Sequence, residues 1–266
     1  MTREAKSATL KAGEPNAIEP ITEVSMSKIA LVTGANKGIG LETVRQLAKA
    51  GVHAILASRD GATGAAAAQK LKAEGLEVEV LTLDVNDPAS IAAAAKAVES
   101  KHGHLDILIN NAGVGIQDGT TKVSEQKMAT WRKTFDTNVF GLIAVTQAFL
   151  PLLKKSEAGR IVNLSSILGS LTLHSDPKSP IYNYKVAAYN VSKTAVNAYT
   201  VQLAYELRDS TIKVNAAHPG HVKTDMGGAA APMELVDGAK TSVALALIGP
   251  DGPNGAYIHM GQKLPW

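Results

Sequence analysis

Cysteine is absent from this chain of 266 residues. Without thiols the chain forms neither disulfide bonds nor thiolate metal sites, which is typical of a cytoplasmic protein, and the cytoplasm is the location we expect. The histidines are scattered along the sequence, and no His-Glu-x-x-His pattern brings two of them onto one helix face. We therefore expect no metal site.

Long apolar runs are missing as well. The longest uncharged segment, Thr137–Leu153, contains the polar Asn138 and the helix-breaking Pro151. It is shorter than the roughly 20 apolar residues that cross a membrane. We expect a buried helix in this segment and no membrane partner.

The first 27 residues lack the apolar stretch of roughly 7–15 residues that a secretory signal requires. They are polar, carry charges of both signs and include Pro15 and Pro20. We interpret residues 1–27 as a flexible N-terminal extension and residues 28–266 as one domain.

Charge of one sign is not concentrated anywhere in the sequence. The net charge is +3, and basic and acidic residues are interspersed. A basic stripe with interleaved aromatic residues, which would favour nucleic acid as a partner, is lacking. Apolar residues make up 45% of the chain, which is enough to bury a sizeable core.

Short apolar runs alternate with helical patterns from residue 28 onward. Such alternation favours right-handed β-α-β crossovers and a parallel sheet covered on both faces, and continuous apolar runs suit strands buried on both sides. We predict an α/β single-domain Rossmann fold, with a doubly wound, mostly parallel seven-stranded sheet and helices on both faces. The strands are expected at Lys28–Thr33, His53–Ala57, Glu77–Leu83, Leu105–Asn110, Arg160–Ser165, Ile212–Ala217 and Ala256–Ile258, and the helices at Leu41–Ala50, Ala62–Glu74, Pro88–His102, Met128–Lys154, Val186–Asp209 and Val236–Ile248.

A glycine-rich segment, TGANKGIG, follows the first predicted strand. Glycine is needed where the backbone turns tightly and approaches a pyrophosphate closely, and the helix that follows presents free N–H groups to that anion. The spacing differs from the standard Gly-x-Gly-x-x-Gly fingerprint, but a strand precedes the segment and a helix follows it. The sequence therefore predicts a nucleotide site formed by Gly34, Asn36, Lys37, Gly38, Ile39 and Gly40.

The end of the second predicted strand indicates which nucleotide binds. An acidic residue about 20 positions beyond the glycines usually binds the ribose 2′-hydroxyl of NAD, but this strand is followed by Ser58 and Arg59. Serine does not repel a 2′-phosphate, and arginine binds one through a bidentate fork. Lys37 adds a second cation, so we expect NADPH rather than NADH. Two alternatives stay open: both cations are ordinary solvated charges, or Asp60 is the acidic residue.

Tyr189 and Lys193 lie four residues apart in AYNVSKTAVNAY, so on a helix they share one face. A phenol has a reference pKa of about 10, and a nearby ammonium favours the phenolate and lowers that pKa. The pair can then exchange a proton with a substrate oxygen. Alone the Tyr-x-x-x-Lys pattern is common by chance; here it follows the glycine segment, an Asn-Asn-Ala-Gly turn and a strand that ends in Ser-Ser.

In this order the motifs resemble those of the classical short-chain dehydrogenase/reductases, from residue 28 to the C-terminus. TGANKGIG is similar to their cofactor loop, NNAG at Asn110–Gly113 to their motif after the fourth strand, and the Tyr189/Lys193 pair to their catalytic pair. HPGHVKTDM, which is His218–Met226, looks like their Pro-Gly…Thr segment. The residues of the cofactor loop and the terminal Leu-Pro-Trp resemble most those of the carbonyl-reductase-like branch.

The resemblance implies roles for four catalytic residues. Tyr189 would protonate the developing alkoxide, and Lys193 would lower the pKa of that phenol and bind the nicotinamide ribose. Ser166, the second serine of SSILG, would hydrogen-bond the substrate oxygen, with Ser165 as the substitute candidate. Asn138 would hold a water that relays protons to Lys193, or would be a buried polar residue satisfied by backbone.

The resemblance also implies further cofactor contacts. They are Asp84 and Val85 at the adenine, Asn111, Ala112 and Gly113 along the ribose and nicotinamide, and Pro219, Gly220, Val222 and Thr224 at the carboxamide. The alternatives to these contacts are a turn or capping role for Asp84, a turn role for Asn111 to Gly113, and a plain loop role for Thr224.

The residues after Thr224 bear on the class of substrate. The stretch MGGAAAPMEL after Thr224 is nearly uncharged and offers no cationic clamp, so we expect a small neutral ketone or aldehyde. The segment between Ser166 and Tyr189 is longer than usual in the family; it brings Tyr182 and Tyr184 near the substrate as aromatic walls, or leaves them in a solvated loop. Family habit suggests a homodimer or homotetramer.

The leading hypothesis is an NADPH-dependent carbonyl reductase. A 3-ketoacyl-carrier reductase and a non-catalytic NADPH-sensing protein are the alternatives.

Overall fold

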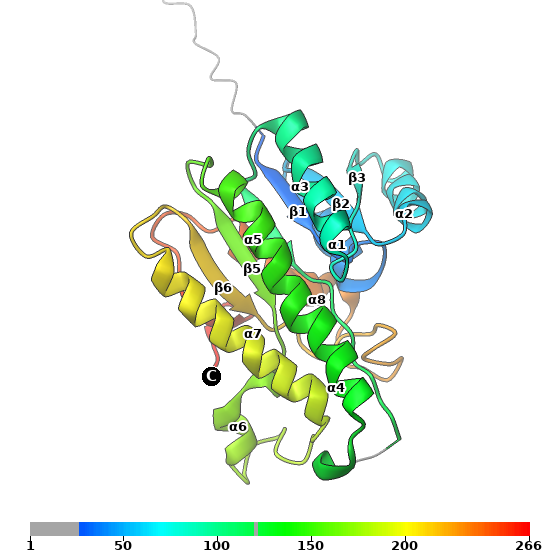
Figure 1. The fold of residues 1–266 in the computed structure, drawn as a ribbon, viewed down its shortest axis with the longest axis vertical. Coiled ribbons are helices and arrows are strands. Elements are labelled where there is room, and N and C mark those ends of the chain that lie inside the picture. The colour runs from blue at the N-terminus through cyan, green and yellow to red at the C-terminus, as the bar shows by residue number, and fades with distance from the viewer. Residues whose placement is uncertain (1–26, 120–121) are drawn as a thin grey trace, which may run out of the picture.

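An eight-stranded sheet forms the centre of the molecule, with the strand order β3-β2-β1-β4-β5-β6-β7-β8 (Figure 1). The computed structural model describes residues 27–119 and 122–266. The predicted flexible extension lies outside these residues, apart from Ser27. The pairs from β3 to β7 are parallel, as predicted. The strands are β1 Ile29–Val32, β2 His53–Ser58, β3 Glu79–Thr82, β4 Ile107–Asn110, β5 Arg160–Leu164, β6 Lys213–Ala217, β7 Tyr257–His259 and β8 Gln262–Lys263.

The eighth strand was not predicted. β8 is two residues long, and both of its side chains are exposed, so it has no apolar pattern to detect. It pairs antiparallel with β7 across a turn in which Met260 and Gly261 have φ angles of 46° and 80°. Two consecutive left-handed residues are typical of a type I′ hairpin turn.

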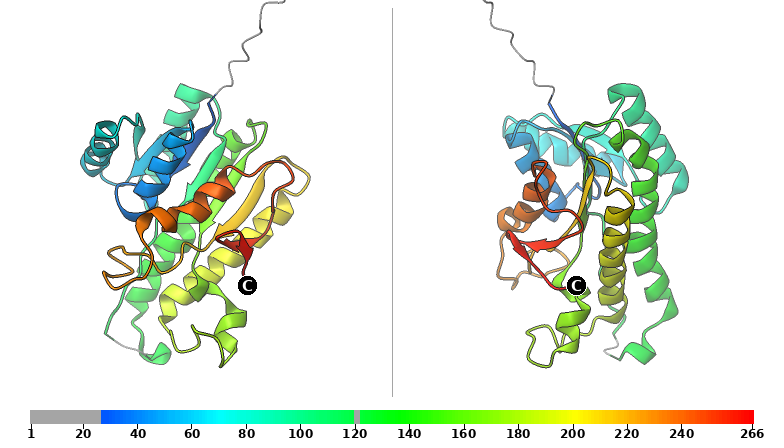
Figure 2. Two further views of the ribbon diagram at one scale, coloured as in Figure 1. Left: turned by 180° about the vertical axis from the view of Figure 1, so that it is seen from behind. Right: turned by 90° about the vertical axis from the view of Figure 1, so that its left-hand side faces the viewer.

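Helices cover both faces of the sheet, and the edge-on view in Figure 2 shows the resulting three layers. On one side α1 and α8 pack against each other, and Val44, Leu47 and Leu245 belong to the apolar core on that side. On the other side α3, α5 and α7 cover a second core that contains Phe149. The helices are α1 Gly38–Lys49, α2 Gly61–Ala73, α3 Pro88–His102, α4 Met128–Phe135, α5 Leu142–Leu153, α6 Leu171–Ser175, α7 Ala187–Glu206 and α8 Leu235–Ala246, with short 3₁₀ turns η1 Val123–Glu125 and η3 Ile167–Gly169.

The long helix predicted from residue 128 to 154 contains a π-helical segment. This segment, η2 Asp136–Gly141, separates α4 from α5 and contains Asn138. π-segments place an extra residue in the helix and occur frequently at functional sites. The stretch Met128–Leu153 is long and apolar enough to cross a membrane by length and composition, but α5 packs against α3 and β4 as a core helix does.

Candidate active site

The carboxyl ends of β1, β4 and β5 meet at one edge of the sheet. The register pairs Val32 with Ile109 and Asn110 with Asn163, so these three strands end side by side. In open α/β sheets ligands bind at this edge. The structure therefore brings the glycine segment, the Asn110–Gly113 turn and the serine pair together, as the sequence predicted.

Close backbone approach explains two glycines of the segment. Gly34 has a φ of +61°, and a Cβ there would lie 2.9 Å from the Cα of Ala112. A Cβ at Gly40 would lie 2.5 Å from Nδ2 of Asn111. A side chain at either position would force the turn after β1 away from the turn after β4.

The start of α1 faces this edge with its amides available. Its N-cap residue, Lys37, makes no side-chain capping hydrogen bond within the described part of the chain. The first N–H groups of a helix have no partner inside the helix, and the helix dipole adds positive potential there. This end of α1, with Gly38, Ile39 and Gly40, has the chemistry of a phosphate site.

The two cations expected at a 2′-phosphate differ in their surroundings. Lys37 forms an exposed ion pair with Asp225, with 2.6 Å between Nζ and Oδ2, so it joins the glycine segment to the loop after β6. Arg59 is exposed at the end of β2. The role of both cations stays a prediction.

Asp60, the alternative acidic residue, is committed to capping α2. Its Oδ1 accepts a hydrogen bond of 2.7 Å from the backbone N–H of Thr63, and this bond is the main cause that lowers the pKa of the carboxyl. Ser58 is buried, and its hydroxyl donates to the carbonyl of Asp60. These contacts favour a helix-capping role for Asp60 over ribose binding.

The catalytic candidates Ser166, Tyr189 and Lys193 converge beyond β5. Lys193 is buried, lies with Nζ 5.8 Å from the centre of the Tyr189 ring, and donates a hydrogen bond of 2.7 Å to the carbonyl of Leu164. Ser166 lies at the N-cap of η3, where its hydroxyl accepts from the N–H of Leu168. The three side chains come from two elements far apart in the sequence.

Ser165, the substitute candidate, is held elsewhere. Its hydroxyl donates a hydrogen bond of 2.6 Å to Oδ1 of Asn197 on α7, and its side chain is buried. Ser166, by contrast, lies at the turn beyond β5, and its interaction with the Tyr189 side chain acts to lower the pKa of that phenol. The position of Ser166 favours it over Ser165 for contact with a substrate oxygen.

Burial sets the acidity of the catalytic pair. It lowers the pKa of Lys193 to about 8. It also raises the pKa of Tyr189, outweighing the hydrogen bond with Ser166. This direction is opposite to the lowering by Lys193 that the sequence suggested, because the cost of desolvating a phenolate exceeds the favourable interactions around it.

The side chain of Asn138 makes three hydrogen bonds within the described residues. Its Oδ1 accepts a hydrogen bond of 2.7 Å from the N–H of Val114, and its Nδ2 donates to the carbonyl of Val114 and to Oγ of Ser192. Asn138 thus joins the loop after β4 to α7, one residue from Lys193. These contacts fit the structural alternative, and its part in a proton relay stays a prediction.

The remaining predicted cofactor residues lie in turns around the same edge. Asp84 accepts from the N–H of Asn86 through Oδ1, as in the turn role left open for it, and Val85 is buried. The Thr224 hydroxyl accepts from the N–H of Gly227 at 2.9 Å. A Cβ on Gly38 would lie 3.8 Å from Cγ2 of Thr224, so this threonine lies against the glycine segment. Pro219, Gly220 and Val222 come from the same loop after β6, and their cofactor contacts stay predictions.

His218 is a residue that the sequence analysis did not single out. Its Nδ1 accepts hydrogen bonds from the N–H of Ile167 at 3.1 Å and from that of Gly220 at 3.3 Å. It therefore joins the turn that carries Ser166 to the Pro-Gly turn after β6. Burial, with a smaller contribution from His259, lowers the pKa of His218 to about 3, which keeps Nδ1 free to accept. Its position directly before Pro-Gly was the only cue in the sequence.

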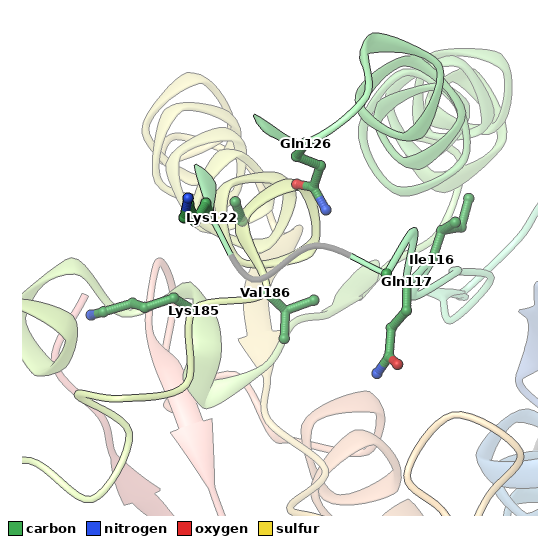
Figure 3. Close-up of a pocket in the computed structure, with 8 residues that line it drawn as sticks. Ile116, Gln117, Lys122, Gln126, Lys185 and Val186 are labelled. Carbon is green, nitrogen blue, oxygen red and sulfur yellow. The ribbon is translucent and has the colours of Figure 1, made fainter. Parts of the chain in front are cut away.

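A pocket of about 280 Å³ lies at the start of α7, two residues before Tyr189 (Figure 3). It is lined by Ile116, Gln117, Gly119, Lys122, Gln126, Lys185, Val186 and Ala187. Tyr182 and Tyr184 do not belong to this lining, and Tyr184 is largely exposed, which fits the solvated-loop alternative. Lys122 and Lys185 lie outside the nearly uncharged stretch that follows Thr224.

Comparison with known proteins identifies the family. The sequence profile described as short chain dehydrogenase matches residues 28–235. The chain belongs to this family. The match covers every strand from β1 to β6 and all of the catalytic candidates.

Relatives of this short-chain dehydrogenase include carbonyl reductases and plant reductases. Carbonyl reductase (NADPH) 1 of Mus musculus is 34% identical over 91% of this chain and 99% of that protein. The (+)-neomenthol dehydrogenase of Capsicum annuum is 31% identical over 89% of this chain and 97% of that protein. Among solved structures, the NADPH-bound carbonyl reductase from chicken fatty liver has a TM-score of 0.79 at 29% identity, covering 90% of this chain and 99% of its own.

We predict that His218→Leu lowers the free energy of unfolding by about 1–3 kcal/mol, because two partly buried backbone N–H groups lose their acceptor. His218→Asn keeps an acceptor and should cost less. Urea unfolding followed by circular dichroism measures both variants. Equal stability of His218→Leu and the unsubstituted chain would contradict the bridging role.

The stability of the unsubstituted chain should also depend on pH through His218. Its pKa in the folded chain lies below the ordinary value of 6.5, so the contribution is complete above pH 6.5 and is lost as pH falls toward 3. Part of this dependence should disappear in His218→Asn.

Proposed function

We propose that this short-chain dehydrogenase is an NADPH-dependent carbonyl reductase, which converts a ketone or aldehyde to an alcohol. The observation that carries the proposal is the convergence of Ser166, Tyr189 and Lys193 at the sheet edge that also holds the glycine segment. The names of the relatives support the same reaction class.

The residues at the edge fit a dinucleotide phosphate. Gly34 and Gly40 leave no room for side chains, and the uncapped start of α1 offers donors to a pyrophosphate. Arg59 stands exposed where the ribose of a dinucleotide lies in this fold, and Asp60 is occupied as a helix cap. When bound, the nicotinamide supplies the hydride that reduces the carbonyl carbon.

Tyr189 acts as the general acid in this proposal. Reduction leaves negative charge on the carbonyl oxygen, and the Tyr189 hydroxyl gives its proton to that oxygen. Because the pKa of Tyr189 is raised, the phenol holds its proton at neutral pH until the substrate oxygen takes it. Ser166 donates a hydrogen bond to the same oxygen and stabilises its charge.

Lys193 stabilises the phenolate that proton transfer leaves behind. With a pKa of about 8 its amine is mostly protonated near neutral pH, and a buried ammonium interacts strongly with a nearby negative charge. Asn138 keeps α7 in place beside the loop after β4 through Ser192 and, through a bound water, would return a proton to Lys193.

The substrate we propose is a small neutral carbonyl compound, which enters beside Ile116, Val186 and Ala187. A reductase of acyl-carrier-bound 3-ketoesters is the second candidate, because Lys185 and Lys122, the latter paired with Glu125 at 2.7 Å, line the pocket at the start of α7. Cations at an entrance attract an anionic partner, so a carrier with an acidic surface would be favoured there. A panel of free ketones and aldehydes beside a 3-ketoacyl carrier thioester separates the two.

We predict oxidation of NADPH in preference to NADH with such a panel, followed by nicotinamide absorbance. Arg59→Ala should weaken the preference by about 10- to 100-fold, mainly through a higher KM for NADPH, because a charge-assisted hydrogen bond contributes roughly 1.5–3 kcal/mol. Lys70→Ala, an exposed cation on α2, serves as the control. Preference for NADH in the unsubstituted chain would refute the 2′-phosphate assignment and leave the Tyr189 mechanism untouched.

Tyr189→Phe should lower turnover by about 10²- to 10⁴-fold, which is the usual contribution of a general acid. NADPH binding, measured by fluorescence titration, should persist because the glycine segment is unchanged. Tyr184→Phe, on the exposed loop, should leave both quantities near their original values. Unchanged turnover in Tyr189→Phe would exclude the mechanism, and absence of turnover in the unsubstituted chain despite NADPH binding would favour the sensing role.

The rate of carbonyl reduction should fall as pH rises through about 8. Above this value Lys193 loses its proton, and the phenolate formed by Tyr189 loses its neighbouring positive charge. Turnover at saturating substrate, measured from pH 6 to 10 alongside circular dichroism, tests this expectation. A rate that stays constant across this range with the fold intact would show that the charge of Lys193 is not required.

A further inference from the structure

Three side chains with metal-binding chemistry meet at the edge of the sheet opposite the active site. His53 is the first residue of β2, Glu79 is the first residue of β3, and His102 is the last residue of α3. Catalytic candidates lie beyond the other ends of the strands, so this cluster is remote from them. The cluster also has no compact sequence motif, since its members are 26 and 23 positions apart.

The fold itself brings the three together. The register pairs Ile55 with Glu79, and because side chains alternate along a strand, His53 lies on the same face of the sheet as both. Helix α3 covers that face and shares a core with Ile55. Gly103, with a φ of 77°, then ends α3 so that His102 lies over β2 and β3.

One carboxylate oxygen is the centre of the cluster. Oε2 of Glu79 lies 2.9 Å from Nε2 of His53 and 2.9 Å from Nε2 of His102. All three potential ligand atoms lie within 4.8 Å of one another. The side chains of Glu79 and His102 are only 16% and 12% exposed, whereas that of His53 is 40% exposed. The cluster is therefore preorganised and open to solvent on one side.

This donor set suits a small divalent cation. Two imidazole nitrogens and one carboxylate oxygen, with a water in the fourth position, are typical of a tetrahedral zinc site. Zinc binds such ligands at about 2.0–2.2 Å, so each of the two gaps between the Glu79 oxygen and an imidazole nitrogen needs to widen by about half an ångström. Small side-chain rotations supply that change.

Lys101 is the counter-charge in the metal-free chain. Its Nζ lies 2.9 Å from the same Oε2 of Glu79, and its side chain is 59% exposed. A long, exposed lysine can swing into solvent when a cation takes its place. It therefore competes with a metal ion without blocking the site.

We propose that His53, Glu79 and His102 form a binding site for a zinc-class divalent cation, which ties β2, β3 and α3 together far from the catalytic residues. Transition metals that favour imidazole, such as Ni²⁺ and Cu²⁺, bind the same ligands, whereas Mg²⁺ prefers oxygen and does not. Binding to the folded chain stabilises it by mass action. The test measures metal binding and not turnover, so its result is independent of the reductase assignment.

The test uses the untagged full-length chain after chelator treatment, with Zn²⁺ and Mg²⁺ as probes. Isothermal titration calorimetry should show one Zn²⁺ per chain and no binding of Mg²⁺. At free Zn²⁺ about 100-fold above Kd, the midpoint of thermal unfolding should rise by roughly 5–10 °C.

Variants distinguish this site from adventitious binding. His53→Gln, at the most exposed ligand and so least disturbing to the fold, should weaken Zn²⁺ binding at least about 100-fold, more than the loss of an outer partner does. His102→Gln should do the same. His104→Gln, in the loop after α3 and paired with Asp106, is the matched control and should bind as before. Lys101→Ala should bind equally or more tightly because the competing ammonium is gone.

Several outcomes would overturn the proposal. They are absence of Zn²⁺ binding to the unsubstituted chain, unchanged affinity in a correctly folded His53→Gln, or an equal loss in His104→Gln. The last result would indicate diffuse binding to surface histidines.

Discussion

The hydrogen bonds between the turns that follow β1 and β4 are the constraint on which the active site depends. Oγ1 of Thr33 accepts hydrogen bonds of 3.0 Å from the backbone N–H groups of Asn111 and Ala112, and Nδ2 of Asn111 donates to the carbonyls of Thr33 and Gly34. These bonds hold the glycine segment against the turn after β4. Without them the start of α1 and the loop that contacts Asn138 would be joined only through the pairing of β1 with β4.

A second set of buried polar contacts joins the long helices to the sheet. Nδ2 of Asn110 donates to Oγ1 of Thr146 on α5 and to Oδ1 of Asn163 on β5, and Nδ2 of Asn163 donates to Oγ1 of Thr200 on α7. Polar groups inside a core are costly unless they are paired, so this chain of bonds specifies one register of helix against sheet. The position of Tyr189 and Lys193 on α7 depends on that register.

Desolvation is the common cause behind the unusual acidities at the site. It raises the pKa of Tyr189, lowers that of Lys193 and lowers that of His218. In each case the neutral form gains, because water no longer stabilises the charge. A neutral phenol can donate a proton, and a neutral imidazole can accept hydrogen bonds from backbone N–H groups. Desolvation therefore favours the form of Tyr189 that acts as the acid and the form of His218 that holds the turn carrying Ser166.

Local patterns in the sequence determined the Rossmann-type architecture, the glycine segment and the Tyr189/Lys193 pair, because apolar periodicity and glycine spacing act over a few residues. Packing decided what depends on distant partners, namely the π-segment around Asn138 and the bridge made by His218. It also decided the balance of pKa effects at Tyr189 and the meeting of His53, Glu79 and His102. Burial and contact between side chains many positions apart arise only when β-α-β units stack, so no local pattern encodes them.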